Sequence, residues 1–432
     1  MHNKATASIR QFTVGITICL LNLFYGIAAS WISPVQNLLK SEQSPVGPLS
    51  DSQISWIGSV PALGAIFGAL FWNEIINYLG RKKSAILTVL PFFSSNLISC
   101  LCTSYYLLLF ARFLSGIGIV GCMINNSNYL SEISENKYKG NLGSLIIVFI
   151  TIGGFFVIVE GSFFDYFYIN LITTVASALL FVLLLFIPES PVHLLRIGQE
   201  EKSKEILKWL RCTEDDFVLN RELEALKDSF LNTSQSTKKL SVNEVLTSPY
   251  YLKVLIISLV IQTGITMSGI GVIIGYSHDV VERMLSDPNA GQYAMLLPLF
   301  QNFGSILIIF VCQMFNRKVC LVTAHILCCL TLMIVGLLLV AQSLYEIQVP
   351  RYIFMTLICC YTFVQGFGIS SIVYITLPEL FSVECRNSFT SLLMFVHFFF
   401  HFMTTKFYPS YVDQIHLYGW AFIFSSYSAF TL

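Results

Sequence analysis

The sequence predicts an all-α membrane protein in which twelve transmembrane helices form two halves of six. Of its 432 residues, 55% are hydrophobic and only 12% are charged, whereas a soluble domain carries roughly 25% charged residues. Apolar stretches of membrane-spanning length recur along the chain, and one long polar segment separates the sixth from the seventh. The 25 basic residues balance the 25 acidic ones, so the basic field of a nucleic-acid-binding protein is missing. These observations exclude a soluble enzyme, a disordered chain and a nucleic acid as partner.

Eleven stretches are long enough to cross a bilayer, which takes roughly 20 apolar residues. They lie at 12–31, 54–79, 84–104, 106–130, 141–161, 168–187, 252–276, 292–315, 319–341, 352–377 and 388–407. A twelfth begins near Tyr418 and reaches the last residue, Leu432, so we expect the final helix to be incomplete in this chain. All are expected to be helices, because an irregular backbone cannot face lipid. The polar start of the chain predicts a retained first helix rather than a cleaved signal peptide.

The orientation follows from the lysine and arginine residues, which favour cytoplasmic loops. A cytoplasmic N-terminus puts the basic loops at 81–83, 137–139 and 317–318 inside the cell. The opposite side then keeps only Lys40, Arg283, Arg351 and Lys406. Both termini and the polar segment are therefore expected to be cytoplasmic.

The polar segment runs from Glu189 to Ser248 and divides the spans six and six, which is the layout of the major facilitator fold. Helical periodicity at 203–210 and 221–230 predicts two short helices within it. The expected organisation is a cytoplasmic N-terminus (1–11), a first six-helix half (12–187), a helical linker (188–250) and a second six-helix half (251–432).

Short motifs at the helix ends are more specific than the hydropathy pattern. They are Gly80-Arg81-Lys82, Arg112-Phe113-Leu114-Ser115-Gly116-Ile117-Gly118, Tyr129-Leu130-Ser131-Glu132-Ile133, Gly140-Asn141-Leu142-Gly143-Ser144, Pro188-Glu189-Ser190-Pro191 and Pro378-Glu379-Leu380-Phe381. In this order the chain resembles the sugar porter family of the major facilitator superfamily, particularly its insect facilitated trehalose transporter-like members. The resemblance implies facilitative transport of a sugar or polyol by alternating access, in the plasma membrane, by a monomer without a cofactor or metal.

In that family, cytoplasmic charges lock the two halves together while the carrier faces outward. The resemblance implies a first-half cluster of Arg81, Glu132, Lys139 and Glu189, and a second-half cluster of Arg317, Glu379 and Arg386. Lys139 replaces the usual arginine, so bidentate pairing is lost there. The alternative is ordinary interfacial pairing, which is worth about 1 kcal/mol or less.

The seventh span departs from the family at the substrate site. The family has Gln-Gln-x-Ser-Gly-Ile-Asn, whereas this chain has Ile265, Thr266 and Gly271 at the three amide positions. Ile147 replaces a further glutamine in the fifth span. We therefore expect hexose binding to be weak or shifted toward less polar ligands, and restoring the three span-seven amides to raise hexose uptake.

Other polar and aromatic residues remain as candidates for contact with the substrate. They are Gln262, Ser268, Tyr276, Gln301, Asn302, Tyr374, His397 and Phe398. A buried polar residue in a membrane helix also commonly bonds one helix to another, so packing is the alternative for each of them.

The energy source is expected to be the substrate gradient alone. Proton-coupled members of the family carry an aspartate in the first span, and Ala28 stands at that position. A proton relay in the membrane requires such a carboxylate, so passive facilitation is favoured. The alternatives are a nontransporting receptor or sensor, and a carrier of a non-sugar solute. An enzyme is not expected, because no nucleophile–base or metal constellation is present in the sequence.

Overall fold

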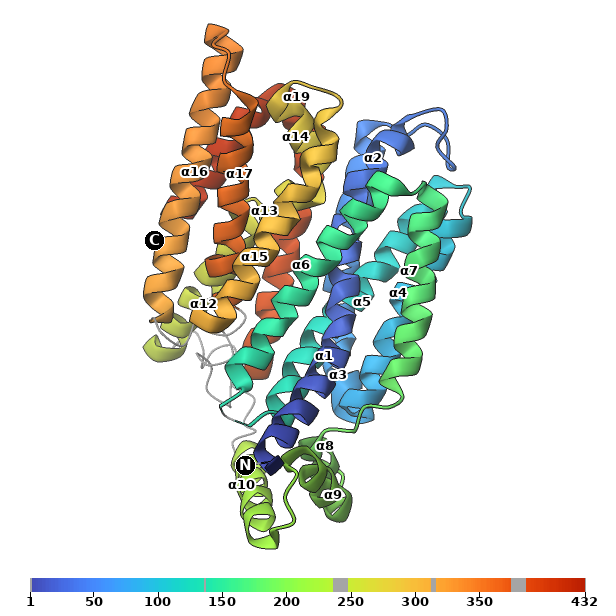
Figure 1. Cartoon of the computed structure of the whole chain (residues 1–432), viewed down its shortest axis with the longest axis vertical. Helices are drawn as coiled ribbons and strands as arrows, with labels where there is room; N and C mark the ends of the chain where they lie inside the picture. The colour runs from blue at the N-terminus through green and yellow to red at the C-terminus, as the bar shows by residue number, and fades with distance from the viewer. Residues whose placement is uncertain (1, 136, 236–247, 312–315, 374–385, 432) are drawn as a thin grey trace.

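A computed structural model describes residues 2–135, 137–235, 248–311, 316–373 and 386–431. Helices and their connections make up these residues, without a strand among them (Figure 1). Ten helical segments in the described part of the chain are long and apolar enough to cross a membrane. They correspond to the first ten predicted spans, so the all-helical membrane fold is confirmed.

The first half contains six long helices and one short one. They are α1 (His2–Ser30), α2 (Ile32–Lys40), α3 (Asp51–Leu79), α4 (Arg81–Leu101), α5 (Tyr105–Ile133), α6 (Lys139–Phe163) and α7 (Tyr166–Leu184). The start of α3 is fixed by a capping box, in which Ser50 and Gln53 satisfy each other's backbone N–H groups. Gly26 and Gly153 let α1 and α6 approach closely, because an added Cβ at either would lie about 2 Å from a carbonyl oxygen of the other helix.

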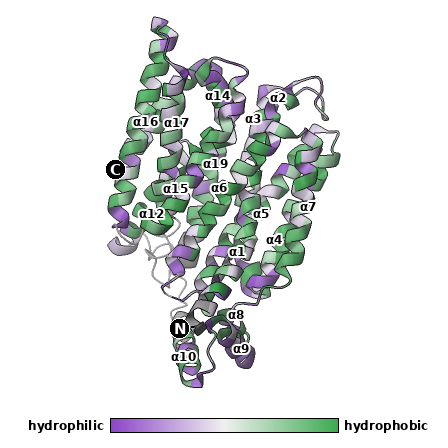
Figure 2. Ribbon diagram, in the orientation of Figure 1, coloured by the Kyte–Doolittle hydropathy of each residue, from purple (hydrophilic) through white to green (hydrophobic). Residues whose placement is uncertain are grey.

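The linker forms α8 (Pro191–Arg196), α9 (Glu200–Arg211) and α10 (Asp216–Gln235), which contain the two helices predicted there. Leu207, Leu219 and Leu223 form a small core of their own. Arg211 ties α9 to the first half by donating to the carbonyl of Ile133 at 2.9 Å. Figure 1 places α8–α10 at the end of the bundle where the N-terminus lies, and Figure 2 shows hydrophilic residues on α9 against largely hydrophobic bundle helices.

The second half is more interrupted than the first. Its elements are α12 (Pro249–Met267), α13 (Ile270–Gly275), α14 (Ser277–Leu285), η1 (Ala290–Met295), α15 (Leu296–Val311), α16 (Arg317–Tyr345), α17 (Arg351–Val364), η2 (Gln365–Ser370) and α19 (Arg386–Phe430). The seventh span breaks at Gly269, whose φ of 94° favours glycine. The tenth span contains the π-helical turn η2. α19 joins the predicted eleventh and twelfth segments across a non-helical residue, His416.

Several contacts between the halves lie at the end of the bundle away from the linker. Ser33 of α2 hydrogen-bonds Ser277 at 2.7 Å and the Nδ1 of His278 at 2.8 Å. Lys406 of α19 donates to the Ser55 hydroxyl of α3 at 2.7 Å and lies 4.2 Å from the centre of the Trp56 ring. These contacts join α2 to α14 and α3 to α19 at that end of the bundle.

Candidate functional site

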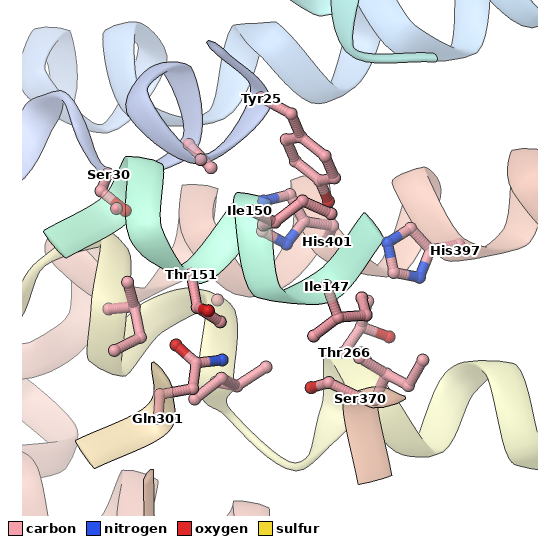
Figure 3. Close-up of a pocket in the computed structure, with 17 residues that line it drawn as sticks. Tyr25, Ser30, Ile147, Ile150, Thr151, Thr266, Gln301, Ser370, His397 and His401 are labelled. Atoms are coloured by element: carbon pink, nitrogen blue, oxygen red, sulfur yellow. The ribbon is translucent and has the colours of Figure 1, made fainter. Parts of the chain in front are cut away.

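A cavity of about 100 Å³ lies between the two halves (Figure 3). Its walls come from α1 and α6 of the first half and from α12, α13, α15, η2 and α19 of the second. A water molecule needs about 10–15 Å³ of such volume, so the space holds several waters or part of a small ligand. Because both halves contribute, a relative movement of the halves changes the access to it.

The four positions at which the family's amides are replaced all line this cavity. They are Ile147 in α6, Ile265 and Thr266 in α12, and Gly271 in α13. Their isoleucines join Ile150, Ile270 and Ile274, so aliphatic side chains from both halves face the same space. The exchange of amides for aliphatic groups therefore changes the chemistry of the cavity itself.

The hydrogen-bonding side chains of the lining are neutral polar groups and two histidines. They are Tyr25, Ser30, Thr151, Thr266, Gln301, Ser370, His397 and His401 (Figure 3). Thr151 also lies 3.1 Å from the hydroxyl of Ser305, across the boundary between the halves. Among the described residues that line the cavity there is no aspartate, glutamate, lysine or arginine. Such a lining suits an uncharged solute.

Two of the predicted substrate residues, Gln301 and His397, line the cavity. Ser268 lies outside the lining, where its hydroxyl donates to the carbonyl of Ile265 and accepts from Gln365 at 2.6 Å. Tyr276 donates to the carbonyl of Thr405 at 3.1 Å and is buried. The polar atoms of both side chains are therefore used within the protein.

Three more of the predicted residues, Gln262, Asn302 and Phe398, are also outside the lining. Phe398 is 2% exposed and packs edge-on against the ring of His397. The side chain of Gln262 is fully buried, and neither of its amide atoms has a hydrogen-bond partner among the described residues. The side-chain oxygen (Oδ1) of Asn302 is likewise buried, without a hydrogen-bond partner among the described residues. Tyr374 lies outside the described residues.

His401 is the cavity residue that the sequence reasoning missed most clearly. It follows His397 by four residues on α19, and the two rings are parallel with their centres 6.3 Å apart. That i, i+4 spacing puts both imidazoles on one face of the helix, so it was the signal available in the sequence. Tyr25, Ser30, Thr151 and Ser370 were missed as well, and no comparable spacing distinguishes them.

The imidazole of His401 lies against the backbone of Gly271. A Cβ added at Gly271 would be 2.6 Å from the Cε1 atom and 2.7 Å from the Nδ1 atom of this ring. The absence of a side chain at residue 271 therefore provides the space that the imidazole occupies. The expected rescue by restored amides needs revision, because an asparagine at residue 271 would collide with His401.

A second cluster lies at the linker end of the first half. Arg81, which is 2% exposed, donates to Glu132 through its Nη2 at 2.7 Å and its Nε at 3.1 Å. Glu189 accepts from the backbone N–H groups of Arg81 at 2.8 Å and Lys82 at 3.1 Å. Ser190 donates its hydroxyl to Glu132. The predicted residues Arg81, Glu132 and Glu189 are thus brought together.

The other predicted gate residues are Lys139 of the first half and the three residues of the second-half cluster. Lys139 is exposed at the start of α6, with no ion pair to a described residue. Arg317 begins α16 in the second half. Glu379 lies outside the described residues, and Arg386 begins α19 at the edge of that gap.

Arg112 is a buried cation of α5 in the first half. Its Nη2 donates to the carbonyl of Ala28 at 2.5 Å, and its guanidinium carbon lies 4.7 Å from the centre of the Trp31 ring. No carboxylate of the described residues pairs with it. A backbone carbonyl and an aromatic face therefore stabilise this charge where an acid is missing.

The sequence profile of the family described as "Sugar (and other) transporter" matches residues 4–432. The chain belongs to this family. It is 25% identical over 406 residues to the facilitated trehalose transporter Tret1-2 homolog of Drosophila sechellia, and the match covers 93% of this chain and 82% of that protein. The facilitated trehalose transporter Tret1 of Drosophila willistoni is 24% identical over 96% of this chain, which spans about half (48%) of that relative.

Solved structures of the xylose transporter XylE from E. coli share the fold of this transporter-family chain. A partially occluded inward-open form has a TM-score of 0.80 at 17% identity, covering 98% of this chain and 96% of that one. The form bound to 6-bromo-6-deoxy-D-glucose has a TM-score of 0.80, with 98% and 94% covered. The chain is therefore a multi-pass membrane protein with the major facilitator fold.

Proposed function

We propose that this chain is a facilitative carrier that moves a sugar or related small polyol across the plasma membrane by alternating access. The observation that carries the proposal is the cavity between the halves, with its uncharged hydrogen-bonding groups. A hydroxyl-rich solute has to exchange its bonds to water for bonds of this kind. The similarity to trehalose transporters and to the xylose transporter XylE supports the same solute class. The carrier acts as a monomer in the lipid bilayer, without a cofactor and without catalysing a reaction.

Alternating access is supported by where the halves touch. The hydrogen bonds of Ser33 and Lys406 join the halves at the outer end, so we expect a solute in this state to leave toward the linker side. Separating these contacts would open the outer end instead. The two states differ in contacts between the halves, which is what a ligand-dependent shift between them requires.

Uptake into oocytes tests the proposal directly. Cells that express the chain should take up at least one of radiolabelled trehalose, glucose, fructose or a polyol in a saturable manner. Gln301→Ala should lower that uptake about fivefold, the effect of losing one hydrogen bond worth about 1 kcal/mol. Surface biotinylation provides the control for expression. A chain that reaches the surface and transports no member of the panel would instead fit the nontransporting receptor.

Transport should proceed without proton coupling. Ala28 offers no carboxylate beside Arg112, and burial lowers the pKa of His278 to about 4, so its contact with Ser33 stays neutral. A histidine with a lowered pKa keeps its neutral form above that pKa, so this outer contact does not titrate between roughly pH 5.5 and 8. Two-electrode recording should detect no substrate-evoked inward current. A current that grows with acidity would contradict this prediction.

The linker and the N-terminus should be cytoplasmic. An amine-reactive reagent that cannot cross membranes should leave Lys208 of α9 unlabelled in intact cells and label it after permeabilisation, because this side chain is half exposed. Lys40, at the end of α2, provides the positive control on the outer side. Labelling of Lys208 in intact cells would invert the proposed orientation.

A further inference from the structure

The cavity has two aliphatic walls that belong to different halves of the carrier. Ile147 and Ile150 of α6 form the first, and Ile265, Ile270 and Ile274 of α12 and α13 form the second. Because both walls move with their own half, a solute that occupies the cavity is held between aliphatic groups in the closed state. Each hydroxyl pressed against such a wall loses its bond to water and gains no partner.

Two of the hydrogen-bonding side chains in the lining already bond within the protein. The amide of Gln301 comes from α15 and the imidazoles of His397 and His401 come from α19, while Thr151 already lies 3.1 Å from Ser305. In addition, the hydroxyl of Thr266 donates to the carbonyl of Thr263 at 3.1 Å. Six hydrogen-bonding side chains remain for a ligand, and the isoleucine walls offer none. The six are Tyr25, Ser30, Gln301, Ser370, His397 and His401.

We infer that the carrier selects a hydroxyl-poor sugar, one with hydroxyls removed or alkylated on the face that meets the isoleucines. The inference rests on the proposed function and names the solute class for the same cavity. The C–H or methyl groups of such a sugar would lie between the two walls, where burial of apolar surface is favourable. Its remaining hydroxyls would meet Gln301 and the two histidines.

Competition among glucose analogues that each lack or methylate one hydroxyl tests the inference. The probes are D-glucose, 2-deoxy-D-glucose, 6-deoxy-D-glucose and 3-O-methyl-D-glucose, measured as kcat/KM for uptake into oocytes. At least one analogue should exceed D-glucose about tenfold, because a buried hydroxyl without a partner costs that much or more in affinity. If D-glucose equals or exceeds every analogue, the inference is overturned and the proposed function stands.

Two variants at one wall position locate the selectivity. Ile147→Gln adds an amide to the α6 wall and should reduce the preference for the best analogue about fivefold or more, mainly by improving D-glucose uptake. Ile147→Leu keeps an aliphatic group of equal size and should preserve the preference. An unchanged preference in Ile147→Gln at normal surface expression would overturn the assignment to the wall. Absence of uptake for all four sugars and for the wider panel would count against the proposed function instead.

Discussion

Gly271→Asn should reduce uptake about tenfold or more, and a second change, His401→Ala, should recover much of the loss. The reason is steric: the Cβ of any residue at 271 would lie 2.6 Å from the imidazole of His401. Overpacking of this kind typically costs about 1–3 kcal/mol, which is roughly a 5- to 150-fold change in an equilibrium constant. With the ring removed, the asparagine amide can take its place in the cavity.

The native chain, the two single variants and the double variant are compared by their uptake of the solute that the native chain transports best. His401→Ala alone should weaken uptake moderately, because the cavity loses one imidazole. Non-additivity between the two changes reports their contact. Gly143→Asn is the matched control, since nothing lies within 4 Å of an added Cβ at this glycine of α6. Normal uptake by the single Gly271→Asn variant would mean that the imidazole moves aside freely, and the pairing would be refuted.

The spans could be predicted from sequence because hydropathy over about 20 residues depends on the bilayer alone. The breaks inside them could not. The seventh span divides at Gly269, where φ is 94° and an added Cβ would lie 2.3 Å from the Phe424 ring. The glycine at this break is required by contact with a residue more than 150 positions away in the sequence. The turn at His416, in contrast, falls between the predicted eleventh and twelfth spans.

The sequence predicted where the candidate site lies better than it predicted which polar side chains face it. The family motif identified Ile265, Thr266 and Gly271 as cavity positions, and all three line it. Ser268 follows them in the motif, yet its hydroxyl bonds to Gln365 within the second half. Which polar group faces the cavity depends on hydrogen-bond partners from helices that are distant in the sequence. A single sequence does not show how each helix is rotated about its own axis.

Glu132→Ala should remove most of the folded carrier. Arg81 and Glu132 pair at 2.7 Å with side chains only 3% and 12% exposed, so removing the carboxylate leaves a buried guanidinium without its counter-charge. Breaking a buried pair in this way costs about 3–5 kcal/mol, a large part of the roughly 5–15 kcal/mol that stabilises a typical domain. The Ser190 hydroxyl would lose its acceptor as well. The expected result is a sharply lower melting temperature in detergent and little protein at the cell surface.

A second pair and a double variant separate this effect from the loss of a charge alone. Asp216→Ala breaks the ion pair with Lys204 at 2.8 Å, whose side chains are 76% and 31% exposed, and it should leave the melting temperature nearly unchanged, because solvent screens exposed ion pairs. Arg81→Met combined with Glu132→Leu should be more stable than Glu132→Ala, because no unpaired charge remains buried. No unpaired charge remains buried in the double variant. If this variant folds but its transport is impaired, the pair therefore has a role in gating beyond stability. Equal melting temperatures for Glu132→Ala and Asp216→Ala would contradict the buried pairing on which this prediction rests.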